Sequence, residues 1–177
     1  GVREVLGQYR RPLKAVLEAS YSWGPMYDWL DEVAEKVVLA HPVKVRAIAE
    51  ARIKTDEIDS RTLAHLLRAD LIPEAYAPSR EIRAVKRVLR QRMFFVRLQG
   101  MVKNRISALL AQHPIPRPEL SDLYGKAGKG WLRALVLEEP DGSILREDLG
   151  FLEVLQERIK STEKLLRDLA AGDDAVG

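Results

Sequence analysis

The first forty residues alternate between short apolar runs and polar, turn-forming stretches. The apolar run at Leu13–Ala19 is followed by a polar stretch that ends in Gly24-Pro25, and its length predicts a buried strand. Pro25–Val33 predicts a helix with proline in its first turn, and Val37–Ala40 predicts a second strand. A strand, a helix and a strand in succession form the outline of a βαβ unit, so this pattern predicts an α/β sheet.

Helical periodicity dominates the chain after position 42. Val43–Ala51 and Ser60–Ala69 each predict a helix, and the polar cluster Arg52–Asp59 lies between them. Leu71–Pro78 contains two prolines and predicts a loop. These elements are expected to complete a first domain over residues 1–77.

The second half of the chain, residues 78–177, predicts two long helices joined by a loop. Apolar residues recur on one face from Ser79 to about Gln112, and the proline- and glycine-containing stretch 113–129 predicts the loop. Gly130–Leu137 predicts a short apolar helix. A coiled-coil seam follows, which should pack on the helix before the loop and favours self-association as a homo-oligomer. Its positions are Leu145, Leu149, Leu152, Leu155, Ile159, Thr162, Leu166 and Leu169.

Composition narrows the class of protein. The chain has 177 residues, of which 46% are hydrophobic and 31% charged, and this balance excludes wholesale disorder. Cysteine is absent, which excludes disulfide scaffolds, thiolate zinc sites and cysteine nucleophiles. No apolar run reaches the roughly 18 residues that a membrane span needs, and basic residues interrupt the N-terminal stretch where a signal peptide would lie. We therefore expect no membrane partner and a cytoplasmic location.

The net charge of +3 conceals an uneven distribution. Nine basic residues and one acid lie between Arg80 and His113, whereas Glu138–Gly177 contains five basic and eleven acidic residues. A strongly basic segment predicts a polyanionic partner. The alternative is that the basic and acidic segments neutralise each other.

Three carboxylates are candidates for metal chemistry. Asp56 and Asp59 are three residues apart and share a helix face, and Glu18 lies where the first strand should end. Carboxylate oxygens suit hard divalent cations, and two such ions can assist phosphodiester cleavage, so Mg²⁺ or Mn²⁺ is the expected cofactor. Spacing alone leaves an alternative open, in which Asp56 caps a helix and Asp59 completes a capping box.

Several strings of residues resemble one transposase family in the same order along the chain. The resemblance is to the insertion-sequence one-ten family, relatives of the Piv-type DNA invertases, and it covers nearly the whole sequence. Its strings are VLEAS at Val16–Ser20, LAHP at Leu39–Pro42, KTDEIDS at Lys54–Ser60, RQR at Arg90–Arg92, VKNRI at Val102–Ile106 and GWL at Gly130–Leu132.

The resemblance implies a fold and a catalytic set. It implies an RNase-H-like (RuvC-like) nuclease domain whose Asp-Glu-Asp-Asp tetrad binds divalent metal, with Glu18, Asp56 and Asp59 matching its last three members. No aspartate precedes Glu18, and the family's serine-bearing C-terminal domain has no counterpart here. We therefore expect an internal fragment, inactive by itself, that combines a partial RuvC-like α/β sheet over 1–77 with a mostly α, antiparallel coiled-coil hairpin over 78–177.

The resemblance also implies nucleic-acid partners, namely DNA and a guide RNA. Arginine and lysine on a helix neutralise phosphates irrespective of base sequence, although a solvated face would have the same composition. Two rival functions remain: a Holliday-junction resolvase of the same fold, and a non-catalytic helical module that binds nucleic acid or oligomerises. The candidate nucleic-acid-binding residues are Lys54, Arg83, Lys86, Arg87, Arg90, Lys103 and Arg105.

Overall fold

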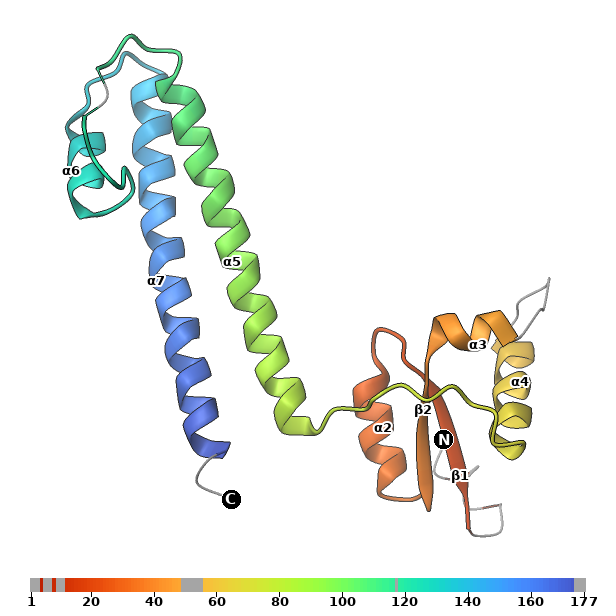
Figure 1. Ribbon diagram of the computed structural model, residues 1–177. Helices are drawn as coiled ribbons and strands as arrows, with labels where there is room; N and C mark the ends of the chain where they lie inside the picture. The colour runs from red at the N-terminus through yellow and green to blue at the C-terminus, as the bar shows by residue number, and fades with distance from the viewer. Residues whose placement is uncertain (1–3, 5–7, 9–11, 49–55, 117, 174–177) are drawn as a thin grey trace. The chain divides into compact units, whose positions relative to one another are not determined.

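The computed structural model describes residues 4, 8, 12–48, 56–116 and 118–173 (Figure 1). The chain divides into two compact units, residues 1–78 and residues 79–177, and each is described by itself. The described residues are mostly helical and include a two-stranded parallel sheet. None of the helices in these ranges is long and apolar enough to cross a membrane.

The sheet of the first unit consists of β1 (Lys14–Glu18) and β2 (Lys36–Ala40). The strands are parallel and in register from Lys14 opposite Lys36 to Glu18 opposite Ala40. The last three residues of β2 are all buried, as expected for a parallel strand that is covered on both faces. The sequence therefore predicted both strands and their parallel βαβ connection correctly.

In the described part of the first unit, three helices accompany the sheet. The connecting helix α2 (Trp23–Asp31) packs on both strands, and its Leu30 is buried. The helix α3 (Pro42–Ile48) follows β2 directly. After the undescribed residues 49–55, α4 (Asp56–Arg68) packs beside β1.

Residues 73–75 run antiparallel to β2 and are hydrogen-bonded to its carboxyl end. Ala40 forms an isolated antiparallel bridge with Glu74, and the His41 N–H donates to the Pro73 carbonyl at 2.9 Å. The Ala75 N–H donates to the Leu39 carbonyl at 2.7 Å. These bonds satisfy backbone groups at the end of β2 that would otherwise be buried without partners.

The second unit is built on two long helices, α5 (Arg80–Leu110) and α7 (Asp141–Asp173), which lie side by side in Figure 1. Two ion pairs show that these helices run in opposite directions. Arg92 pairs with Glu163, whereas Arg105, which comes later on α5, pairs with Asp148, which comes earlier on α7. Their shared core is densest near the connecting loop. Its buried members are Val102, Ile106, Leu109, Leu110, Leu132, Leu145, Leu149, Leu152 and Leu155.

The first four leucines of the predicted seam, Leu145, Leu149, Leu152 and Leu155, lie in the core that α7 shares with α5. Leu152 is fully buried and Leu155 is nearly so, whereas Thr162 and Leu166 farther along the seam are half-buried. Since α5 of the same chain covers these leucines, they are not available to bind a second copy of the chain.

The loop prediction for 113–129 is only partly correct. A helix, α6 (Lys126–Ala134), begins inside that stretch and ends before the predicted Leu137, while Leu135 is already extended. Tertiary packing explains the difference, since Leu132 of α6 is fully buried in the core of the second unit. Helices form against such a core even where glycine lowers their intrinsic propensity.

Candidate metal-binding edge and nucleic-acid interface

Glu18 is the last residue of β1, at the carboxyl end of the sheet. Its register partner is Ala40, the last residue of β2, and the Ala19 N–H donates to the Ala40 carbonyl at 3.0 Å. The Glu18 side chain is exposed. The carboxyl edge of a parallel sheet is where α/β proteins collect their ligands, so Glu18 lies at a plausible site and remains accessible there.

The direction of α4 brings its first turn to the same edge. Ala64 and Leu67, in the second half of α4, line a cavity together with Lys14 and Val16 of β1. The end of α4 thus lies beside the beginning of β1, and its first residue, Asp56, lies toward the end where β1 finishes. Figure 1 shows α4 starting at the edge of the sheet where β1 and β2 end.

The backbones of Asp56 and Asp59 are both helical, within the first turn and a half of α4. Their side chains lie outside what the structure describes, as does all of Lys54. Within the described ranges no three histidine or acidic side chains gather into a potential metal site. The structure thus places two backbone segments and one side chain of the expected triad, but no assembled ligand set.

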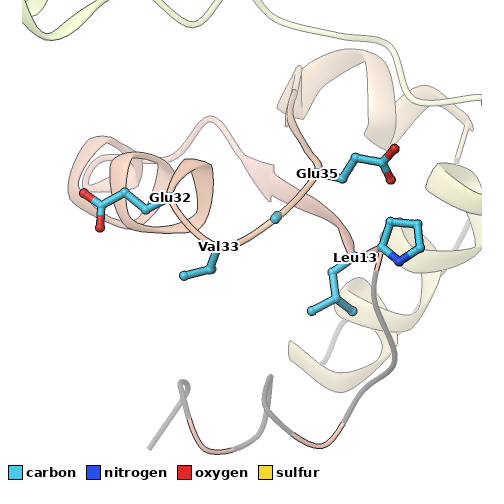
Figure 2. Close-up of a pocket in the computed structure, with 6 residues that line it drawn as sticks. Leu13, Glu32, Val33 and Glu35 are labelled. Carbon is cyan, nitrogen blue, oxygen red and sulfur yellow. The ribbon is translucent and has the colours of Figure 1, made fainter.

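Described residues at the opposite end of the sheet line two cavities. One, of about 450 Å³, is lined by Leu13 just before β1, by Glu35 just before β2, and by Glu32 and Val33 between α2 and β2 (Figure 2). The other, of about 430 Å³, is the cavity beside Lys14 and α4. Both lie at the amino end of β1 and β2, so neither belongs to the edge where Glu18 lies.

Among the ion pairs that the described residues form, two link cations of the basic helix α5 to α7. Arg92 donates two hydrogen bonds to Glu163, at 3.0 and 2.7 Å. Arg105 donates from Nε to the largely buried Asp148 at 3.1 Å, while about two thirds of its own side chain stays exposed. The acidic helix therefore neutralises part of the basic helix, and Arg105 keeps solvent-accessible N–H groups beyond this pair.

Lys103 makes a different kind of contact, with the loop before α6. Its Nζ lies 5.1 Å from the centre of the Tyr124 ring, and the Tyr124 hydroxyl donates to the Lys103 carbonyl at 2.6 Å. The same hydroxyl lies 2.7 Å from the Ser107 hydroxyl. Tyr124 thus attaches the loop to α5 and orients Lys103 through a cation–π contact.

Four further cations of α5 are exposed, and their side chains make no hydrogen bond or ion pair with any residue that the structure describes: Lys86, Arg87, Arg90 and Arg97. Lys86, Arg90 and Arg97 follow one another at intervals of four and seven residues, so they share one face of the helix. Arg97 is absent from the candidates chosen on sequence. Arg97 comes seven residues after Arg90, and this spacing would have placed it on the same helix face from the sequence. Arg83, another candidate on α5, takes part in an interaction of its own.

Carboxylates at two helix starts have a pKa below the ordinary value. At α5, a hydrogen bond with Ser79 is the main cause that lowers the pKa of Glu81, and Ser79 Oγ also accepts from the Ile82 N–H at 3.4 Å. At α7, hydrogen bonds with Ser143 and Arg146 lower the pKa of Glu139. Glu139 accepts from the Ser143 N–H at 3.1 Å and thereby caps the helix.

Comparison with known proteins identifies the family. A family model of DEDD transposases of the IS110 type, described as "Transposase", matches residues 2–115, which is more than half of the chain. The match includes Glu18, Asp56, Asp59 and the whole of α5. The search of curated proteins and the search of solved structures found no match. The chain belongs to the IS110 family of DEDD transposases, the insertion-sequence one-ten family that its motifs resemble.

Proposed function

We propose that this chain forms part of a transposase that cleaves and transfers DNA strands with the help of a divalent cation. The observation that supports this most directly is the common edge at which β1 ends and α4 begins. That edge receives Glu18 together with the backbones of Asp56 and Asp59. The family match supports the same assignment, because a DEDD transposase is named for the carboxylates that it uses.

The donor set fits magnesium or manganese. Glu18 offers an exposed carboxylate, and the sequence supplies two further acids, Asp56 and Asp59, at the start of α4. Carboxylate oxygens are the ligands that these hard cations take in proteins. When bound, such a cation stabilises negative charge at the phosphate under attack. The role of Glu18, Asp56 and Asp59 is to hold it, and we expect three carboxylates by themselves to bind it weakly.

The two units receive different roles in this proposal. Residues 1–77 would form part of a RuvC-like nuclease domain, an assignment supported by the parallel β1–α2–β2 arrangement and the helix packed beside β1. Residues 78–177 would form a coiled-coil arm, supported by the antiparallel pairing of α5 and α7 and by the buried heptad-like seam of α7.

The exposed face of α5 is proposed to bind the phosphates of DNA, and of a guide RNA where one is present. Lys86, Arg87 and Arg90 support this, because within the described chain no acid neutralises them. Arg83, Lys103 and Arg105 complete the proposed set on α5, and Lys54 of the first unit is proposed as a separate phosphate contact. Arg105 can serve both as a partner of Asp148 and as a phosphate ligand, since most of its side chain is exposed.

Self-association through the arm remains part of the proposal, but on a different surface from the α7 seam. Leu89, Met93 and Val96 on α5 are each at least 40% exposed. Exposed apolar side chains repeated along a helix favour contact with another chain.

The test is recombination by the paired variant Asp56→Asn/Asp59→Asn in a protein that supplies the tetrad's first aspartate and the serine. We expect recombination to be abolished and the melting temperature to be nearly unchanged. Glu57→Gln is the matched control, because position 57 lies between the two aspartates but on a different helix face. Recombination that survives in the paired variant, accompanied by a clear loss of stability, would show that the aspartates only cap the helix.

A further inference from the structure

Phe94 is an exposed aromatic residue in the middle of the cationic face of α5. Its side chain is 52% exposed, while the adjacent Phe95 packs partly buried against the core of the second unit. The two ring centres are 5.9 Å apart and their planes are tilted by 48°. Phe95 therefore contacts Phe94 from the core side and leaves its ring available to solvent.

Cations without a partner in the described chain lie on both sides of this ring. Arg90 precedes Phe94 by four residues and Arg97 follows it by three, so all three side chains share one face of the helix. The two arginines are two helical turns, or about 10.5 Å, apart along the axis. No aspartate or glutamate occurs between Ile82 and Gln112. A polyanion is therefore the partner that complements this surface in charge.

The ring distinguishes between kinds of polyanion. A duplex keeps its bases stacked inside and presents phosphates, which would use the arginines and leave Phe94 exposed. A single strand presents its bases as well, and aromatic side chains beside cations are the usual platform on which such bases stack. Met101, one heptad after Phe94 and 63% exposed, adds an adaptable apolar contact on the same face.

We infer that Arg90, Phe94 and Arg97 form a binding site for single-stranded DNA, in which a base stacks on Phe94 and the arginines hold the flanking phosphates. The inference rests on the proposed function, since it takes DNA as the partner because the chain belongs to a transposase family. Beyond the proposed function, the inference states that the DNA strand in contact with α5 is unpaired.

The test is fluorescence anisotropy of the 177-residue chain with labelled oligothymidine, with a DNA duplex and with oligouridine, over a series of salt concentrations. For Phe94→Leu we expect oligothymidine binding to weaken about tenfold, with duplex binding unchanged. Phe94→Tyr should restore the affinity. The matched control is Phe151→Leu on α7, because Phe151 is 48% exposed and is followed by Val154 rather than by an arginine at the equivalent spacing.

The same experiment distinguishes the contribution of the arginine charges to binding from the contribution of base stacking. Arg90→Gln/Arg97→Gln should reduce the magnitude of the salt slope for the single strand by about 1.4, whereas Phe94→Leu should leave the slope unchanged. An unchanged slope in the arginine variant refutes the phosphate contacts of Arg90 and Arg97, and with them the part of the proposed function that rests on Arg90. If the slope falls but Phe94→Leu binds like the unsubstituted chain, only the stacking inference fails.

Other outcomes also overturn the inference. Equal losses of single-strand and duplex binding in Phe94→Leu would show that the ring does not read unpaired bases. Oligouridine binding as tightly as oligothymidine, or more tightly, would refute the assignment to DNA. No measurable binding of any nucleic acid, together with self-association that Phe94→Leu abolishes, would identify this face as a protein interface.

Discussion

Arg105 of α5 and Asp148 of α7 form the one ion pair in the described chain that includes a buried carboxylate. Arg105 Nε lies 3.1 Å from Asp148 Oδ2, and the Asp148 side chain is only 13% exposed. The two residues are 43 positions apart, so the pair fixes the register of α5 against α7 next to the core residues Ile106 and Leu149.

This pair should show energetic coupling. Arg105→Gln leaves the Asp148 carboxylate largely buried without its charged partner, so we expect the free energy of unfolding to fall by about 1 kcal/mol. Asp148→Asn in the Arg105→Gln background should then cost much less than it does alone. Urea unfolding of the two single variants and the double variant measures this coupling.

The control is the exposed pair of Lys36 and Glu74, whose side chains are 50% and 59% exposed. We expect its coupling energy to be close to zero, because solvent screens both charges. Additive effects at Arg105 and Asp148, like those of the control pair, would contradict the role assigned to the buried carboxylate.

Gly128 should tolerate no side chain. It is buried at the start of α6, and a Cβ built there would lie 2.1 Å from the Leu123 carbonyl oxygen, which belongs to rigid backbone. We expect Gly128→Ala to lower the free energy of unfolding by about 1–3 kcal/mol, since α6 must move away from the loop before it. Urea unfolding followed by circular dichroism measures the loss.

Gly130, two residues later on the same helix, is the matched control. Nothing lies within 4 Å of a Cβ built there, and alanine is the better helix former. We therefore expect Gly130→Ala to raise the free energy of unfolding by about 0.5–1 kcal/mol. Equal effects of the two substitutions would refute the close packing of α6 on Leu123.

Lowering the pH should reduce the stability of the second unit, because the Glu139 carboxylate becomes protonated. Hydrogen bonds with Ser143 and Arg146 hold the pKa of Glu139 below its ordinary value of 4.5, so the folded state favours the carboxylate. The stability that this contributes is present above the unfolded-state pKa and is lost as the pH falls through the lowered, folded-state value.

Thermal unfolding across this acidic range tests the point. Glu139→Gln should be less stable than the unsubstituted chain near neutral pH and should lose less of its stability on acidification. Glu138→Gln is the control, since the Glu138 side chain makes neither of these contacts in the described structure. Identical pH profiles for the Glu139→Gln variant and the unsubstituted chain would contradict the capping role.

The elements that sequence predicted best are those defined by local pattern. The apolar runs that became β1 and β2 were short and bounded by turn residues, and the heptad-like leucines of α7 required a helical partner. The start of α6 was missed because glycine-rich sequence predicts a loop, whereas its helix depends on Leu132 entering a core made by distant residues.

The site was predicted less completely, for reasons of geometry. The position of Glu18 at a strand end follows from the pattern, and the structure agrees with it. Which cations of α5 remain unneutralised depends on the register of α5 against α7, and sequence does not reveal that Arg92 meets Glu163 at a separation of 71 residues. The metal-binding role of Asp56 and Asp59 stays a prediction.

The most direct test of that role is metal-directed cleavage of the chain itself. Fe²⁺ at millimolar concentration takes the place of Mg²⁺ on carboxylate ligands, and with ascorbate and peroxide it cuts the backbone beside its site. The account predicts cuts near Glu18 and near Asp56–Asp59 that excess Mg²⁺ suppresses and that Asp56→Asn/Asp59→Asn abolishes, but Glu57→Gln does not. Cuts scattered along the chain, or cuts near Glu18 that persist in the paired variant, would contradict it.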